Sequence, residues 1–203
     1  GGFAHDTGEG SISVHHRAKG GDLIWEIGSG YFGCRNADGT FNADKFAENA
    51  RDPQVKMIEL KLSQGAKPGH GGVLPGAKVT AEIAAARGVP EGQDCISPAR
   101  HSAFNTPIEM LQFIARLREL SGGKPVGFKL CIGHPWEWFA LAKAMLETQL
   151  LPDFIVIDGG EGAAAGLVAK LGAKAEIARE LAYRLYTLCE RKKRAAEALA
   201  YNG

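Results

Sequence analysis

The residues with the clearest capacity for chemistry lie in short polar segments that follow apolar runs. Gln64–Gly72 contains four glycines, an amide, a lysine and a histidine. Such a loop brings backbone N–H groups close to a ligand, and Lys67 can neutralise a carboxylate or a phosphate. The segment matches neither a P-loop nor a dinucleotide-binding fingerprint. It predicts a loop that binds an anionic ligand, with an ordinary glycine-rich turn as the alternative.

A second polar segment, His5–Gly10, is followed closely by His15 and His16. The spacing of its histidine and carboxylates matches no standard metal site, so no metal is expected here. Carboxylate chemistry by Glu9, which lies between two glycines, is the favoured interpretation.

Two further segments place charge at buried strands. Lys129 lies in the middle of the apolar run Val126–Cys131, where a lysine is costly unless it meets an opposite charge. In a barrel this side chain points inward, to a substrate or cofactor anion, and a structural ion pair is the alternative. Asp158–Gly162 ends another apolar run.

The elements that position these residues follow from short apolar runs and helix caps. Four runs predict buried strands and a fifth is weaker: Leu23–Ile27, Met57–Leu62, Val126–Cys131 and Phe154–Asp158, then Asp94–Ser97. Helices are expected between them, over Ala43–Ala50, Val79–Arg87, Pro107–Leu120 and Trp136–Glu147.

The strands recur about every 30 residues, with a helix in most intervals, which predicts a parallel sheet in an α/β fold. A doubly wound sheet and a (β/α)8 barrel both fit this repeat. The long polar loops after the strands favour the barrel, whose chemistry lies at that rim. A full barrel needs about 250 residues, so a chain of 203 predicts a partial barrel.

The C-terminal segment changes in character. Residues 163–203 show no strand pattern and carry an apolar stripe beside many lysines and arginines. We expect a helical tail of different origin from residues 1–162, with its stripe packed on the core. Membrane or nucleic-acid binding by this basic face is the alternative.

Composition excludes several classes of protein. The net charge of +1 argues against a nucleic-acid or membrane-surface partner, and no apolar run approaches a membrane span. The four cysteines form no CxxC pair and fit reduced thiols of a cytoplasmic protein.

Several motifs together resemble the FMN-binding synthase domain of glutamate synthases, and in particular its shorter stand-alone relatives. The resemblance covers about residues 1–162 and rests on Leu23–Gly33, Lys61–Gly69, Gly71–Gly72, Leu74–Gly76 and Ile157–Gly162. It implies a (β/α)8 barrel with FMN and a 3Fe–4S cluster that reductively aminates 2-oxoglutarate to glutamate with electrons from a donor.

The resemblance also implies roles for individual residues. Gln64, Lys67 and Arg87 would bind the substrate carboxylates, and Glu9 and Lys67 would act in catalysis. The flavin would be bordered by the following residues: Glu26, Lys129, Asp158, Gly159, Gly160 and Glu161. Lys129 would lie at the pyrimidine end of the flavin, where a cation stabilises the reduced ring.

The sequence departs from the family pattern in ways that affect function. The usual flavin-facing first strand, the later strands that bind the phosphate and the cluster cysteines are not found. The chain alone is therefore expected to bind FMN weakly and to be inactive. The favoured function is that of a fragment of a glutamate synthase-like oxidoreductase. One alternative is a non-catalytic truncated or chimeric remnant. The other is a nucleic-acid-associated module that uses the tail.

Overall fold

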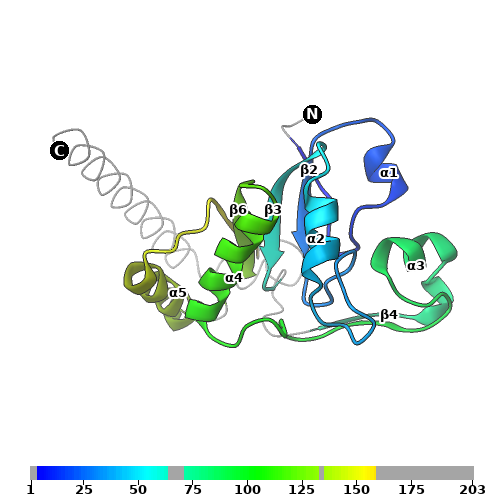
Figure 1. Ribbon diagram of the computed structural model, residues 1–203. Helices are drawn as coiled ribbons and strands as arrows, with labels where there is room; N and C mark the ends of the chain where they lie inside the picture. Colours follow the sequence, from blue (N-terminus) through cyan, green and yellow to red (C-terminus); the bar gives the residue numbers. More distant parts are fainter. Residues whose placement is uncertain (1–3, 64–70, 133–134, 159–203) are drawn as a thin grey trace.

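The computed structural model describes residues 4–63, 71–132 and 135–158. Its main element is a curled parallel sheet of five strands in the order β1-β2-β3-β6-β7 (Figure 1). The strands are β1 (His5–Asp6), β2 (Leu23–Ile27), β3 (Val55–Lys61), β6 (Val126–Cys131) and β7 (Ile155–Asp158). Every pair of neighbours is parallel, which confirms the α/β fold and the partial barrel.

Three helices cover one face of this sheet. They are α2 (Ala43–Ala50), α4 (Pro107–Leu120) and α5 (Pro135–Thr148); in Figure 1, α2 and α4 lie in front of the strands and α5 lies beside α4. Alternate strand residues such as Ile58 and Phe128 are fully buried in the core. Trp25 of β2 stacks on Phe46 of α2, with ring centroids 5.4 Å apart. The apolar core thus lies between the sheet and the helices. The opposite face of the sheet does not contribute to this core and can carry polar groups.

The helices begin where the sequence places their caps. The side chain of Asn42 accepts a hydrogen bond from the backbone N–H of Lys45 at the start of α2. Thr106 and Glu109 form a reciprocal capping box at the start of α4, and Pro107 is its first residue. The bounds of α2 and α4 match the sequence prediction, and α3 (Ala81–Arg87) is capped by Thr80.

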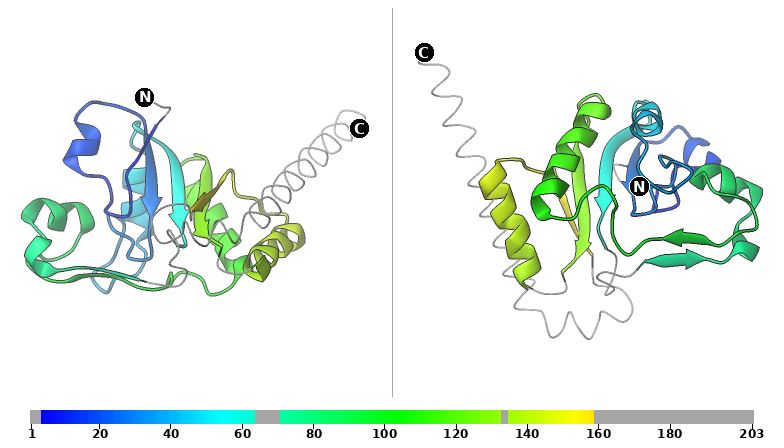
Figure 2. Two further views of the ribbon diagram at one scale, coloured as in Figure 1. Left: turned by 180° about the vertical axis from the view of Figure 1, so that it is seen from behind. Right: turned by 60° about the horizontal axis from the view of Figure 1, so that its bottom comes forward.

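The expected parallel strand at Asp94–Ser97 is wrong. β5 (Cys95–Ser97) pairs antiparallel with β4 (Gly72–Leu74) in a separate two-stranded ribbon, which lies beside the sheet in the right view of Figure 2. Ile96 is 60% exposed while its two neighbours are buried. A strand inside a parallel barrel would be covered on both faces, so this segment could not fill that position. β3 therefore pairs directly with β6.

The ribbon belongs to the long connection between β3 and α4, which we call the excursion. It also contains the 3₁₀ helix η1 (Gly76–Lys78) and α3, and Figure 1 shows α3 to the side of the sheet. A short helix α1 (Val14–Arg17) lies between β1 and β2. β1 consists of only two residues, both exposed, and contains no apolar run. For this reason the sequence pattern did not predict it.

The predicted helical tail at residues 163–203 lies outside the described residues. Within the part of the chain that the structure describes, no helix combines the length and apolar character of a membrane span.

The capping box predicts a measurable effect on stability. Replacing Thr106→Ala removes the acceptor for the Glu109 N–H, at 3.2 Å, and should lower the free energy of unfolding by about 1 kcal/mol. Gln112→Ala, at an exposed position of the same helix, should change it by less than about 0.5 kcal/mol. Urea denaturation of the two variants tests this. Equal effects would contradict the importance of the cap.

Candidate active site at the carboxyl end of the sheet

Charged side chains gather on the face of the sheet opposite the helices. Successive strand residues point to opposite faces, so Ile58 and Leu60 enter the core while Glu59 and Lys61 face the other way. Lys129 is the register partner of Lys61, and Glu26 is the register partner of Glu59. The inner face of the partial barrel is therefore built from charges.

Glu26 is the centre of a network of ion pairs. Its Oε1 lies 3.1 Å from Nζ of Lys61, and its Oε2 lies 3.3 Å from Nζ of Lys129. The first lysine also contacts Oε2 of Glu9 at 3.1 Å, and the second contacts Oδ2 of Asp158 at 3.7 Å. Glu26 is only 2% exposed, so the two cations offset the cost of burying its charge. The network joins the ends of β2, β3, β6 and β7 to the loop after β1.

Glu9 reaches this network because the loop after β1 turns tightly. Gly8 has a φ of +66°, and its N–H donates to Oδ1 of Asp6 at 2.7 Å. The side chain of Glu9 then passes over Gly28, where a Cβ would lie 2.7 Å from its Cγ. A glycine at position 28 is thus required for Glu9 to approach Lys61.

The environment keeps Glu9 ionised. Burial alone would raise the pKa of Glu9, but a hydrogen bond from Ser97 and the charge of Lys61 lower it below its ordinary value. Arg87 adds a smaller effect in the same direction. Glu9 is therefore suited to accept a proton or a hydrogen bond at neutral pH.

Lys129 is also held in its charged form. Burial would lower the pKa of Lys129, but Glu26 and, with smaller effects, Glu59 and Asp158 raise it. The lysine presents a permanent cation on the inner face. It is also partly accessible, with a fifth of its side chain exposed.

Arg87 lies close to Glu9 at the end of α3. Its guanidinium carbon is 4.8 Å from the centre of the Phe32 ring, and its Nη1 is 3.6 Å from Sγ of Cys95. A Cβ at Gly10 would lie 3.4 Å from its Nη2. The arginine is thus positioned by packing beside the loop that carries Glu9.

A buried histidine fixes the end of β3. Nε2 of His101 lies 2.8 Å from the carbonyl oxygen of Lys61, and Nδ1 lies 3.1 Å from the hydroxyl of Tyr31. Since the carbonyl can only accept, Nε2 carries the proton and the hydroxyl donates to Nδ1. Burial lowers the pKa of His101 to about 4, although the Lys61 carbonyl and Glu9 oppose this, so the ring is neutral at neutral pH. Tyr31 adopts a φ of +48°, and Ala103 N–H donates to its hydroxyl.

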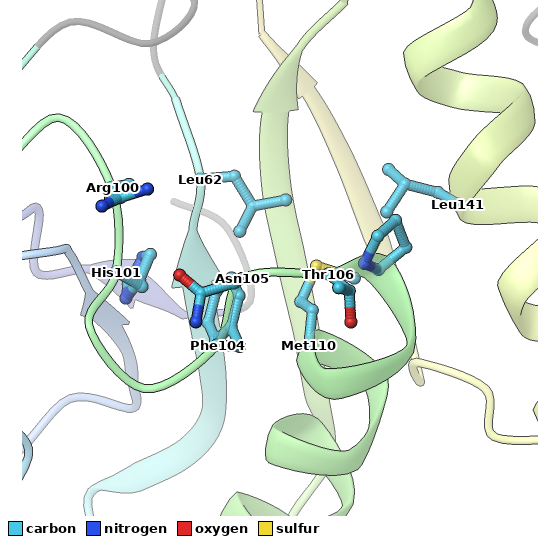
Figure 3. A pocket seen from close by; sticks show the side chains of 9 residues that line it. Leu62, Arg100, His101, Phe104, Asn105, Thr106, Met110 and Leu141 are labelled. Atoms are coloured by element: carbon cyan, nitrogen blue, oxygen red, sulfur yellow. The ribbon is translucent and has the colours of Figure 1, made fainter.

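A cavity of about 250 Å³ opens beside this histidine, on the helix side of the sheet. Figure 3 shows Arg100 and His101 on one side of it and Leu141 of α5 on the other, with Met110 of α4 between them. Its lining is mainly apolar and Leu62 points into it, away from the inner face that carries Lys61. The cavity is therefore separate from the charged network.

The structure brings together four of the residues that the sequence proposed for the site. Glu9, Glu26, Lys129 and Asp158 form one network, and Arg87 lies beside it. The other proposed residues lie outside the described residues: Gln64, Lys67, Gly159, Gly160 and Glu161. The roles of all of them stay predictions.

Sequence reasoning missed the lysine that links the network. Glu59 and Lys61 lie two positions apart in an otherwise apolar strand, so the argument applied to Lys129 also applies to them. His101 and Ser97 gave no such signal, because they lie within the long segment between β3 and α4, far in sequence from the residues that they contact.

The fold and the site define a class of α/β proteins: parallel barrels with a charged inner rim. The family model "Conserved region in glutamate synthase" matches residues 1–196. The chain belongs to the glutamate synthase family. The match does not stop at residue 162, and it includes most of the segment for which the sequence suggested another origin.

Curated relatives agree with this assignment. The glutamate synthase large subunit-like protein YerD of Bacillus subtilis is 47% identical over 162 residues, covering 80% of this chain and 30% of the relative. The archaeal glutamate synthase [NADPH] of Methanocaldococcus jannaschii is 37% identical over 157 residues, covering 77% and 28%. That of Archaeoglobus fulgidus is 33% identical over 186 residues, covering 87% and 32%. The chain thus spans about a third of the length of these relatives.

The buried histidine predicts a pH dependence of stability. His101 binds a proton more weakly when folded than when unfolded, so stability is present above pH 6.5 and is lost as pH falls toward about 4. The loss from this group should be about 3 kcal/mol. We expect His101→Gln to flatten the dependence, and His15→Gln, at an exposed position, to leave it unchanged. Urea unfolding between pH 4 and 7 measures both, and parallel curves for all three proteins would refute the assignment.

Proposed function

We propose that this chain supplies the substrate side of a flavin-dependent glutamate synthase-type oxidoreductase, which converts 2-oxoglutarate and ammonia to glutamate. One observation carries the proposal. Glu9, in the loop after β1, and Lys129, on β6, are connected through Lys61 and Glu26 at the carboxyl ends of the strands. This rim is where barrels perform catalysis. The family match supports the same reading.

The chain's own residues can bind and orient the substrate. 2-Oxoglutarate carries two carboxylates, and we assign Gln64, Lys67 and Arg87 to them. Arg87 is suited to this because a guanidinium binds a carboxylate through two parallel hydrogen bonds. It lies on the Glu9 side of the network, so a bound substrate would have its reacting carbon near that carboxylate.

Glu9 is proposed to manage the proton of the substrate nitrogen. Ammonia adds to the keto carbon with loss of water, which leaves an imine that must carry a proton before it accepts electrons. The ionised carboxylate of Glu9 can accept a hydrogen bond from that N–H and stabilise its positive charge. The ion pair with Lys61 holds the carboxylate of Glu9 in place.

The residues on the inner face fit the pyrimidine end of FMN. Lys129 is a permanent, partly accessible cation there, which matches the negative charge that a reduced isoalloxazine carries. FMN, when bound, supplies the two electrons that reduce the imine. Glu26 and Asp158 hold Lys129 toward it. In the described residues, the only cluster with potential metal ligands holds no cysteine, so this part does not fit an iron–sulfur cluster.

Weak flavin binding is expected for the 203-residue chain alone. A charge-assisted contact from Lys129 is worth about 1.5–3 kcal/mol, whereas immobilising a ligand costs about 4–15 kcal/mol. Flavin fluorescence titration should therefore show no stoichiometric binding at micromolar concentration. Tight binding that Lys129→Ala abolishes would show that the chain holds a complete flavin site.

Substrate recognition gives a second test. The chain should bind 2-oxoglutarate, measured by calorimetry, and Arg87→Gln should weaken binding by roughly 10- to 100-fold, the loss of one charged hydrogen-bonding partner. Arg51→Gln, at an exposed position distant in sequence, is the matched control. Pyruvate, which lacks the second carboxylate, should bind more weakly. Absence of saturable 2-oxoglutarate binding would instead favour the non-catalytic remnant.

A further inference from the structure

A further carboxylate, Glu59, lies beside the network and forms no ion pair with any described lysine or arginine. Oxygen atoms of Asp6, Glu26 and Glu59 all lie within 4.8 Å of one another on the inner face. Glu59 is 2% exposed, and its Oε1 is buried without a hydrogen-bond partner. A buried carboxylate with an oxygen that lacks a partner is unfavourable as an anion.

None of the described residues beside Glu59 in the sheet forms an ion pair with it. On β2 its register partner is Glu26, whose two oxygens are already taken by Lys61 and Lys129. On β6 its register partner is Gly127, which has no side chain. Asp6 of β1 accepts the N–H of Gly8 and adds only negative charge.

Among the described residues, carboxyl groups outnumber cations on this face even when Arg87, which lies beside Glu9, is counted. Five carboxyl groups and two lysines lie close together on the inner face, on the five strands and the loop after β1. They are Asp6, Glu9, Glu26, Glu59, Asp158, Lys61 and Lys129. Glu26 and Glu59 are the buried carboxyl groups of this set, and a proton on Glu59 would remove the negative charge that lacks an ion pair.

We propose that Glu59 is a protonated carboxylic acid up to neutral pH and shares its proton with Glu26, forming a buried proton-holding pair beneath the two lysines. Glu59 acts as a positioning residue. Its proton limits the negative charge under Lys61 and Lys129, so that both lysines can still attract an anionic ligand from the open side.

The electrostatics agree with this geometry. Burial, then the charges of Asp6 and Glu26, raise the pKa of Glu59 to about 7, although Lys129 acts in the opposite direction. A hydrogen bond to Glu26 raises the pKa further. Loss of the proton above this pH would add a negative charge that holds the lysines more tightly to the sheet.

A divalent cation is the competing way to neutralise the cluster. Three carboxylates can bind Mg²⁺ or Ca²⁺ through oxygen. Here, however, both oxygens of Glu26 already contact lysines. A metal would have to displace those lysines, whereas a proton on Glu59 leaves them in place.

Infrared spectroscopy of the 203-residue chain tests the proposal without any ligand. At pH 6 we expect a C=O stretching band of a buried carboxylic acid that shifts in D₂O and disappears as pH rises through about 7. Glu59→Gln should remove the band, and Glu48→Gln, at an exposed position of α2, should retain it. Because no substrate or flavin is present, the result is independent of the proposed function.

The pH profile of unfolding provides a second measurement, made on His101→Gln so that the opposite pH dependence from this histidine is removed. A carboxyl group that holds its proton more tightly when folded makes the protein lose stability as pH rises from about 4.5 to about 7. We expect proton release on unfolding in this range. The proposal would be overturned if the band is absent at pH 6 or if it persists in Glu59→Gln. It would also be overturned if the chain lacks the band and binds Mg²⁺ or Ca²⁺ stoichiometrically.

Discussion

The arrangement of the inner face depends on one buried carboxylate. Glu26 forms ion pairs with Lys61 and Lys129, which come from the two strands that follow β2 in the sheet order. Glu26 is 2% exposed, and its charge is offset by these two lysines, each of which also contacts a second carboxylate. Glu9 and Asp158 contact the outer sides of these lysines, so the candidate site is held by the same interactions that allow charges to lie inside a sheet.

Much of the fold could be predicted from the sequence because its signals are local. Thr106, Pro107 and Glu109 specify the start of a helix within four residues, and the structure places α4 between the expected ends. The parallel strands are short apolar runs, and their spacing is sufficient to indicate the alternation of strand and helix. The position of Lys129 on the inner face also follows, since an apolar strand with one lysine must direct it to a charge.

Other features depend on pairing between distant segments, which local patterns do not report. Cys95–Ser97 resembles a strand, and only its partner β4 determines that it forms an antiparallel ribbon outside the barrel. His101 is 40 residues from the Lys61 carbonyl that it contacts, and the excursion between them hides the relation. The link from Lys61 to both Glu9 and Glu26 likewise depends on the sheet order.

The register of the sheet has a consequence for how the chain folds. Glu26 lies beside Glu59, and Lys61 lies beside Lys129, so neighbouring strands place like charges directly opposite each other. Such pairs are destabilising, and a slip of β6 by two residues would bring Lys129 beside Glu59 without turning any side chain to the other face. The charges thus favour a competing alignment, a case of local frustration. Selection of the native alignment falls to the apolar side of the strands, where Phe128 must fit the helices. Burial of apolar side chains between the sheet and the helices therefore stabilises a register that the interactions among the charges alone would disfavour.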